Sequence, residues 1–240
     1  MLIKTRGIVF RSVKYSETSI IADIYTEEKG LRKYIFSGVR SAKSKVAPSL
    51  LQVMSLVELV AYDREDRELN RVKEIRPALV YTGIPFDVRK GAVGLFMVEV
   101  ARKTIKEAQE NQSLFEFLFQ AFAFLDETRL PVPHIHLYFL LELSPFLGFV
   151  PGGEASAQTP FFDLKEGVFS PSVPNHVHYL DEQNSLLLHQ LLYSNFEICH
   201  TLGFNRDERR NLLMHLLDYY KLHIENFPEI HAHKVLQEVL

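Results

Sequence analysis

The sequence predicts a two-part α+β protein, in which a five-stranded closed β-barrel precedes an all-helical region with a small inserted β-hairpin. Three observations predict this fold class. Five short β-branched and aromatic segments lie within the first 80 residues, apolar residues at helical spacing begin after Pro77, and that spacing stops between residues 148 and 181. We therefore expect domains at residues 1–78 and 79–240, with an irregular insertion at residues 148–181.

The five predicted strands are bounded by turn signals and span residues 3–13, 19–26, 31–36, 53–62 and 70–76. Gly30 completes a predicted hairpin turn after Glu28 and Lys29, because glycine adopts positive φ without strain. No helix of useful length separates the strands, so a parallel sheet is not expected. One longer connection, at residues 37–49, follows the third strand and suits a small closed barrel such as the OB-fold.

Helical patterns follow around residues 93–101, 113–125, 133–143, 186–193, 207–224 and 229–240. The helix at 113–125 is apolar nearly all round and should lie centrally. Asn205 can cap the helix at 207–224, with Glu208 as its capping-box partner. Within the insertion, the segments 161–164 and 168–170 predict a small hairpin.

Composition indicates a folded intracellular protein. Hydrophobic residues make up 47% and charged residues 24% of the 240 residues, which argues against disorder. The opening residues do not resemble a signal peptide, and the apolar stretch at 135–143 is too short to span a bilayer. The single Cys199 excludes an intrachain disulfide and a multi-cysteine zinc site. We expect a cytoplasmic location.

The net charge of −3 conceals an asymmetry. Residues 1–80 carry 15 Lys and Arg against 10 Asp and Glu, whereas residues 81–240 carry 12 against 20. A basic first third joined to an acidic remainder suggests two modules with different partners.

A basic segment in the first module predicts DNA binding. It has five cations and no acid over fourteen residues: Arg32, Lys33, Arg40, Lys43 and Lys45. Clustered cations neutralise phosphates, although a solvated basic loop is the alternative. Possible base-stacking platforms are Tyr15, Tyr25, Tyr34 and Phe36. Tyr34 and Phe36 share a strand face with Arg32, which fits either base stacking or barrel core.

Two further cation sets have open interpretations. The first set extends the basic surface or, as an equal explanation, protects a strand edge from aggregation; it comprises Lys4, Arg6, Arg11 and Lys14 on the first strand and Arg71, Lys73 and Arg76 on the fifth. The second set is expected to bind an acidic peptide tail, or else to form an ordinary solvated helix face; it comprises Arg89, Lys90, Arg102, Lys103 and Lys106.

Catalytic chemistry has no support in the sequence. There is no P-loop, no nucleophile elbow, no zinc-protease motif and no dinucleotide fingerprint. Acidic residues at 63–68 are interleaved with arginines, which favours a solvated turn over a metal site. There are His-x-His pairs at 134/136, 176/178 and 231/233. The first and last pairs lie at predicted helix ends, where residues two apart do not share a face, so ordinary satisfied or exposed histidines are favoured over chelation. We expect no enzyme activity, no metal, no cofactor and no small-molecule substrate.

The chain resembles the RecO recombination-mediator family. The segments that carry the resemblance keep their order along the chain: residues 7–12 (GIVFRS), 15–18 (YSET), 26–30 (TEEKG), 36–41 (FSGVRS), 43–45 (KSK), 147–151 (LGFVP), 219–223 (YYKLH) and 234–236 (KVL). The resemblance implies an N-terminal OB-fold, DNA annealing, and loading of recombinase onto single-stranded DNA with a RecR partner. It also implies contact with the acidic tail of single-stranded-DNA-binding protein and association with the bacterial nucleoid.

The chain departs from that family at the insertion. Many members carry four zinc-binding cysteines there, and this sequence has none between residues 148 and 181. Because His176 and His178 alone do not complete a tetrahedral site, we expect the hairpin to persist through the packing of Phe161, Phe162 and Phe169.

The sequence leaves two functions open. The first is a module that binds and anneals single- and double-stranded DNA through phosphate contacts. The second is an adaptor, in which the helical domain binds repair proteins and DNA binding is incidental. Oligomeric state and strand preference stay open.

Overall fold

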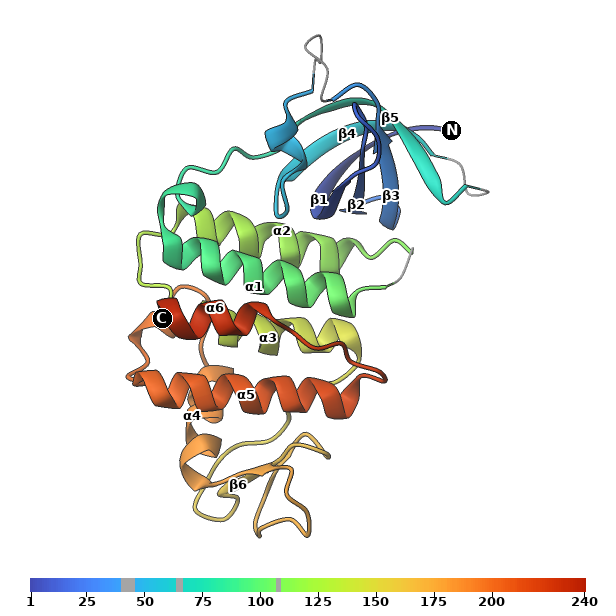
Figure 1. Cartoon of the computed structure of the whole chain (residues 1–240). Helices are drawn as coiled ribbons and strands as arrows, with labels where there is room; N and C mark the ends of the chain where they lie inside the picture. The colour runs from blue at the N-terminus through green and yellow to red at the C-terminus, as the bar shows by residue number, and fades with distance from the viewer. Residues whose placement is uncertain (40–45, 64–66, 107–108) are drawn as a thin grey trace. The chain divides into compact units, whose positions relative to one another are not determined.

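The computed structural model describes residues 1–39, 46–63, 67–106 and 109–240 (Figure 1). It contains two compact units, Met1–Thr128 and Arg129–Leu240. The first unit combines a β-barrel with helices α1 (Val88–Thr104) and α2 (Gln112–Glu127). The second contains the remaining helices and a small sheet. The expected domain boundary at residue 78 stays a prediction.

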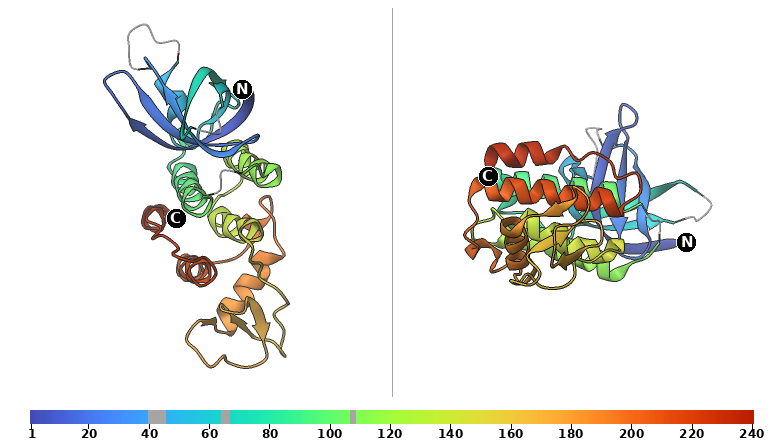
Figure 2. Two further views of the ribbon diagram at one scale, coloured as in Figure 1. Left: turned by 90° about the vertical axis from the view of Figure 1, so that its right-hand side faces the viewer. Right: turned by 90° about the horizontal axis from the view of Figure 1, so that it is seen from below.

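Five strands between residues 2 and 77 form a closed barrel, as predicted, and the left view of Figure 2 shows their curvature. Its strands are β1 (Leu2–Lys14), β2 (Ile20–Thr26), β3 (Gly30–Phe36), β4 (Leu56–Tyr62) and β5 (Leu69–Pro77). They are joined in the order β1-β2-β3-β5-β4. All pairings are antiparallel except β3 with β5, which is parallel over three residue pairs. This is an OB-like barrel.

Turn chemistry sets the strand ends. Gly30 has φ +61°, as expected of the turn after β2, and a Cβ there would lie 2.2 Å from the carbonyl oxygen of Gln109. β4 begins at Leu56 rather than at residue 53, because Met54 has φ 77° and interrupts the extended backbone. The carbonyl of Val9 accepts the Met54 N–H at 2.8 Å and secures this turn.

Alternating side chains fill the barrel. Ile24, Tyr34, Val57 and Ala61 are completely buried, and Leu59 is nearly so. Tyr25 lies parallel to Phe10, with ring centroids 5.6 Å apart, and its ring also contacts Phe115 of α2. Burial of these rings is a main source of stability for the first unit.

The carboxylate of Asp126 anchors the segment that leads into α1. It accepts the backbone N–H groups of Thr82 at 2.8 Å, Gly83 at 2.8 Å and Ile84 at 2.7 Å. Burial of Asp126 acts to raise its pKa, but these three backbone donors outweigh burial and hold the pKa below its usual value. The end of α2 is thereby fastened to the start of α1.

The second unit packs four helices with a three-stranded sheet. The helices are α3 (Ile135–Leu143), α4 (Glu182–Leu192), α5 (Arg206–His223) and α6 (Ala232–Val239), and the strands are β6 (Phe161–Asp163), β7 (Val168–Ser170) and β8 (Tyr179–Leu180). Asn205 caps α5 and forms the predicted capping box with Glu208. The buried Tyr220 hydroxyl donates to the Leu140 carbonyl at 2.6 Å and ties α5 to α3.

The inserted hairpin is present and is packed by aromatic rings. Phe162 of β6 meets Phe169 of β7 edge to face, with ring centroids 4.9 Å apart, and Phe162 also contacts Tyr219. Phe161 contacts Tyr179 of β8. The predicted aromatic packing of the hairpin is thus confirmed.

Candidate nucleic-acid interface

The predicted basic segment is only partly described. Lys33 on β3 is exposed, and its ammonium lies 2.8 Å from the Glu68 carboxylate, whose hydrogen bond raises the pKa of Lys33. Arg32 is half-buried, and its guanidinium reaches the Leu31 carbonyl at 3.5 Å. The other three predicted cations, Arg40, Lys43 and Lys45, lie outside the described residues. Their part in DNA binding stays a prediction.

The stacking role considered for Tyr34 is wrong. Its side chain is 0% exposed, so neither ring face can meet a base, and Phe36 is 3% exposed. Burial and the charge of Asp63 raise the pKa of Tyr34 to about 12. Both rings are part of the barrel core.

A hollow of about 550 Å³ lies along β5, and we call it the Arg71 hollow. Its described lining residues include three cations and no acid: Tyr62, Arg67, Leu69, Asn70, Arg71, Val72 and Lys73. Arg71 and Lys73 were both predicted site residues. Arg71 is exposed, and among the described side chains no carboxylate pairs with it. Positive charge therefore gathers in this hollow, although Lys73 lies 3.6 Å from Glu74.

A β-bulge brings Lys73 into this arrangement. Val60 pairs with Glu74 and Ala61 pairs with Val72, which leaves Lys73 as the extra residue between them. Strict alternation would place Arg71 and Lys73 on the same face, as the sequence suggested. The bulge instead places Lys73 at the boundary between two hollows, because it lines both.

The second hollow, of about 500 Å³, is the Lys4 hollow. Its charged lining side chains are Lys4, Glu58, Lys73, Glu74 and Arg76. Arg76 is 2.5 Å from Glu58, and Lys73 is 3.6 Å from Glu74. Much of the positive charge of the Lys4 hollow is therefore neutralised by acids that line the same hollow. The Arg71 hollow is therefore the better site for phosphate.

Arg6, which the sequence placed on the same strand as Lys4, has a structural role. Its guanidinium lies 2.8 Å from both Glu27 and Glu116 and 4.9 Å from the ring centre of Phe119. The hydrogen bonds that Arg6 donates to these two carboxylates raise its pKa despite partial burial. Arg6 thus links the barrel to α2 and is not available for phosphate.

The five cations predicted to bind a protein partner do not form one patch. Arg89 lies at the start of α1, whereas Arg102 and Lys103 lie in its last turn, roughly 20 Å away at 1.5 Å per residue. Lys103 lies 2.6 Å from Glu99. Lys106 is exposed beyond the end of the helix.

The prediction that Lys90 binds a protein partner is wrong. Lys90 is 8% exposed, and its ammonium donates to the carbonyls of Asp126 and Thr128, both at 2.7 Å. It fastens α1 to the end of α2 and cannot reach a partner.

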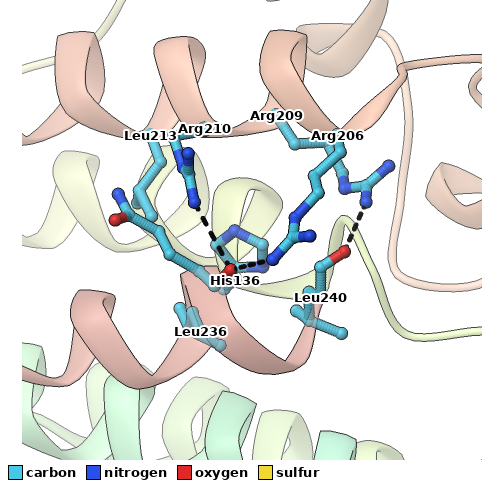
Figure 3. A pocket seen from close by; sticks show the side chains of 8 residues that line it. His136, Arg206, Arg209, Arg210, Leu213, Leu236 and Leu240 are labelled. Carbon is cyan, nitrogen blue, oxygen red and sulfur yellow. Dashed lines mark hydrogen bonds between the residues drawn. The ribbon is translucent and has the colours of Figure 1, made fainter.

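Sequence reasoning missed a cation cluster in the second unit. Arg206, Arg209 and Arg210 extend from the first turns of α5 toward the end of α6, where they line a small pocket with the buried His136 (Figure 3). Arg209 donates to the Leu240 carbonyl at 2.7 Å, and Arg206 donates to that of Gln237. The 3–4 spacing of these arginines was the available signal.

The described residues show no group of three or more side chains able to hold a metal ion. In the insertion, His176 lies 3.2 Å from Asp163, and the rings of His176 and His178 are 6.2 Å apart. His134 and His136 are buried in the second unit; burial lowers the pKa of His134 to about 4 and that of His136 to about 3. Within the described chain, no helix is both long and apolar enough to cross a bilayer.

Two family models match the chain in sequence. The model described as Recombination protein O N terminal matches residues 1–81, and Recombination protein O C terminal matches residues 85–229. Curated relatives called DNA repair protein RecO match with similar coverage. The Bacteroides fragilis protein is 35% identical over 240 residues, covering 100% of this chain and 99% of the relative. The Phocaeicola vulgatus protein is 34% identical over 239 residues, again at 100% and 99% coverage. The chain therefore belongs to the RecO family of DNA repair proteins.

Proposed function

We propose that this protein is a non-enzymatic recombination mediator. Its barrel binds single- and double-stranded DNA, anneals complementary strands and, with a RecR-like partner, helps load recombinase in the bacterial cytoplasm at the nucleoid. The Arg71 hollow supports this proposal most directly, since its described lining has three cations and no acid. Family membership supports the DNA-repair role.

Binding is expected to depend on phosphate contacts and therefore on salt. Lys4, Arg67, Arg71 and Lys73 line the two hollows around β5. Lys73 lies 3.6 Å from Glu74, which is a longer separation than the 2.5 Å between Arg76 and Glu58. If each neutralises one phosphate of a single strand, together they contribute a log–log salt slope of roughly −3, at about −0.7 per contact. The predicted loop cations Arg40, Lys43 and Lys45 would make the slope steeper.

The test is a titration of labelled single-stranded DNA at several salt concentrations. Arg71→Ala with Lys73→Ala should flatten the slope by roughly 1.4, at about 0.7 per lost phosphate contact. Arg89→Ala, an exposed cation on α1, is the matched control and should leave the slope unchanged. A wild-type protein whose affinity does not depend on salt would contradict the proposal.

An adaptor role is the second candidate, favoured by an exposed apolar pair beside a cation at the start of α1. Phe86 is 87% exposed and Val88 is 73% exposed, and Arg89 follows them. An acidic peptide with apolar residues, such as the tail of single-stranded-DNA-binding protein, has complementary chemistry. Partner capture from nuclease-treated extract that is lost in Phe86→Ala would support the adaptor. Capture that requires DNA would refute it.

A further inference from the structure

We propose that Tyr62 is the residue on which a bound single strand stacks a base. The strand would then follow the face formed by β1, β4 and β5, and not the face of β2 and β3. This inference rests on the proposed DNA-binding function and adds to it the residue that reads an unpaired base.

The first 77 residues contain six aromatic side chains, and all six are described. Four of them, Phe10, Tyr25, Tyr34 and Phe36, are at most 3% exposed. Only Tyr15, at 63%, and Tyr62, at 48%, present a ring to solvent. Stacking needs an accessible aromatic face, so the barrel offers just these two candidates.

Tyr62 has cations on the side where phosphates are needed. It is paired with Arg71 of β5 and with Leu2 of β1, so these three side chains share one face of the sheet. Leu2 is 49% exposed and offers an apolar flank for a base. Tyr62 also lines the Arg71 hollow together with Arg67 and Lys73. One ring with three neighbouring cations matches a base with its flanking phosphates.

Tyr15 lacks this setting. It lies in the turn after β1, where its backbone N–H donates to Ser19, whereas Tyr62 pairs with the opposite end of β1 at Leu2. Tyr15 is absent from the described lining of both hollows. It is an exposed tyrosine without a cationic hollow, which makes it a matched control.

The opposite face of the barrel is less suited to a single strand. Its register aligns Asp23 with Arg11 and Lys33, and each of these cations lies near an acid. The neighbouring outward positions, Ile21 and Ile35, are aliphatic. The aromatic residues of β2 and β3 themselves, Tyr25, Tyr34 and Phe36, are at most 3% exposed.

Lys73 defines the course of the strand. Because the bulged Lys73 lines both hollows, a strand stacked on Tyr62 continues past Lys73 toward Lys4. β5 has 9 residues and is roughly 30 Å long, which is enough for several nucleotides. This course runs along β5 over its whole length.

The test compares Tyr62→Ala, Tyr62→Phe and Tyr15→Ala, each checked for folding by far-UV circular dichroism. The probe is a single-stranded oligonucleotide that contains 2-aminopurine, whose fluorescence reports stacking, and the parallel probe is the matching duplex. Tyr62→Ala should weaken single-strand binding roughly 5- to 150-fold, as loss of one stack does elsewhere. The salt slope should not change, because no charge is lost.

The other measurements should give affinities close to that of the wild type. Tyr62→Phe keeps the ring and should bind within about twofold of the wild type, and Tyr15→Ala should do the same. Duplex affinity should change little in Tyr62→Ala, since paired bases are not free to stack on the ring. If Tyr62→Ala does not fold, Tyr62→Leu keeps an apolar side chain on the strand and removes the ring.

The outcomes separate the inference from the function. Wild-type single-strand affinity in Tyr62→Ala or Tyr62→Leu, with the salt slope intact, overturns the inference and leaves the DNA-binding function standing. Equal losses in Tyr62→Ala and Tyr62→Phe point to the hydroxyl and overturn stacking, as does an equal loss in Tyr15→Ala. Absence of salt-dependent DNA binding in the wild type refutes both.

Discussion

Replacing Asp126 should show how much of the first unit depends on one buried carboxylate. Asp126 is 3% exposed, and its two oxygens accept three backbone N–H groups at 2.7–2.8 Å. Asp126→Ala leaves all three donors without this acceptor. At about 1.5 kcal/mol for each lost bond to a charged group, the free energy of unfolding should fall by about 4–5 kcal/mol. That is a large fraction of the stability of an ordinary domain.

Asp126→Asn separates the charge from the geometry. Oδ1 accepts from Gly83 and Ile84, whereas Oδ2 accepts from Thr82. The asparagine keeps an oxygen for the first two donors and turns an NH₂ group toward the third. We expect a loss of about 2–3 kcal/mol, between the wild type and Asp126→Ala. This milder variant keeps the prediction testable if Asp126→Ala fails to fold.

Urea unfolding measured by far-UV circular dichroism and tyrosine fluorescence is the assay, since the chain has no Trp. Glu127→Ala, which removes an exposed neighbouring acid, is the control. Because the folded-state pKa of Asp126 is lowered, its stabilisation is present above the unfolded pKa of about 3.9 and is lost as pH falls through the folded pKa. The difference between wild type and Asp126→Asn should thus shrink below about pH 4. A usual single substitution lowers the free energy of unfolding by about 1 kcal/mol. If Asp126→Ala lowers it by no more than about 1 kcal/mol beyond Glu127→Ala, the reasoning is refuted.

Three further predictions concern other parts of the fold. Burial lowers the folded-state pKa of His134 to about 4 and that of His136 to about 3, so both contribute stability above pH 6.5 that is lost as pH falls. Between pH 7.5 and 5.5 the free energy of unfolding should therefore fall by about 1.4 kcal/mol per histidine. A urea midpoint that does not change over this pH range would contradict the prediction. Asn205→Ala removes the cap of α5 and should cost about 1 kcal/mol in urea unfolding, whereas Asn205→Ser should retain most of it. Gly30→Ala should cost over ~1 kcal/mol, because φ is +61° and the new Cβ would meet Gln109; a melting temperature equal to the wild type would rule out this strain.

The barrel and the helices could be predicted from the sequence because their signals are local. Turn residues and alternation located all five strands, and 3–4 spacing located the helices. The orientation of β3 could not be predicted in this way. Leu31 and Ile35 make one face apolar and Tyr34 and Phe36 make the other aromatic, so alternation alone cannot say which side faces the core.

The roles of the candidate site residues could not be predicted locally, because they depend on contacts with residues distant in the sequence. Lys90 has the pattern of a helix-surface lysine, and its burial depends on carbonyls 36 and 38 residues later. The bulge at Lys73 arises from the register between β4 and β5, which no local pattern encodes. In the sequence Tyr62 ends an ordinary strand, and only the register between β4 and β5 places it opposite Arg71.

The parallel pairing of β3 with β5 has a consequence for folding kinetics. It closes the barrel with three residue pairs, Lys33 with Leu69, Tyr34 with Asn70 and Ile35 with Arg71, each 36 residues apart in the sequence. The other pairings include the short-range hairpins β1–β2 and β2–β3. Bringing these strands together costs loop-closure entropy, and three residue pairs return little stabilisation for that cost. Closure of the barrel should therefore be a late step in folding. The amide protons of this seam should accordingly exchange with solvent before those of the hairpins do.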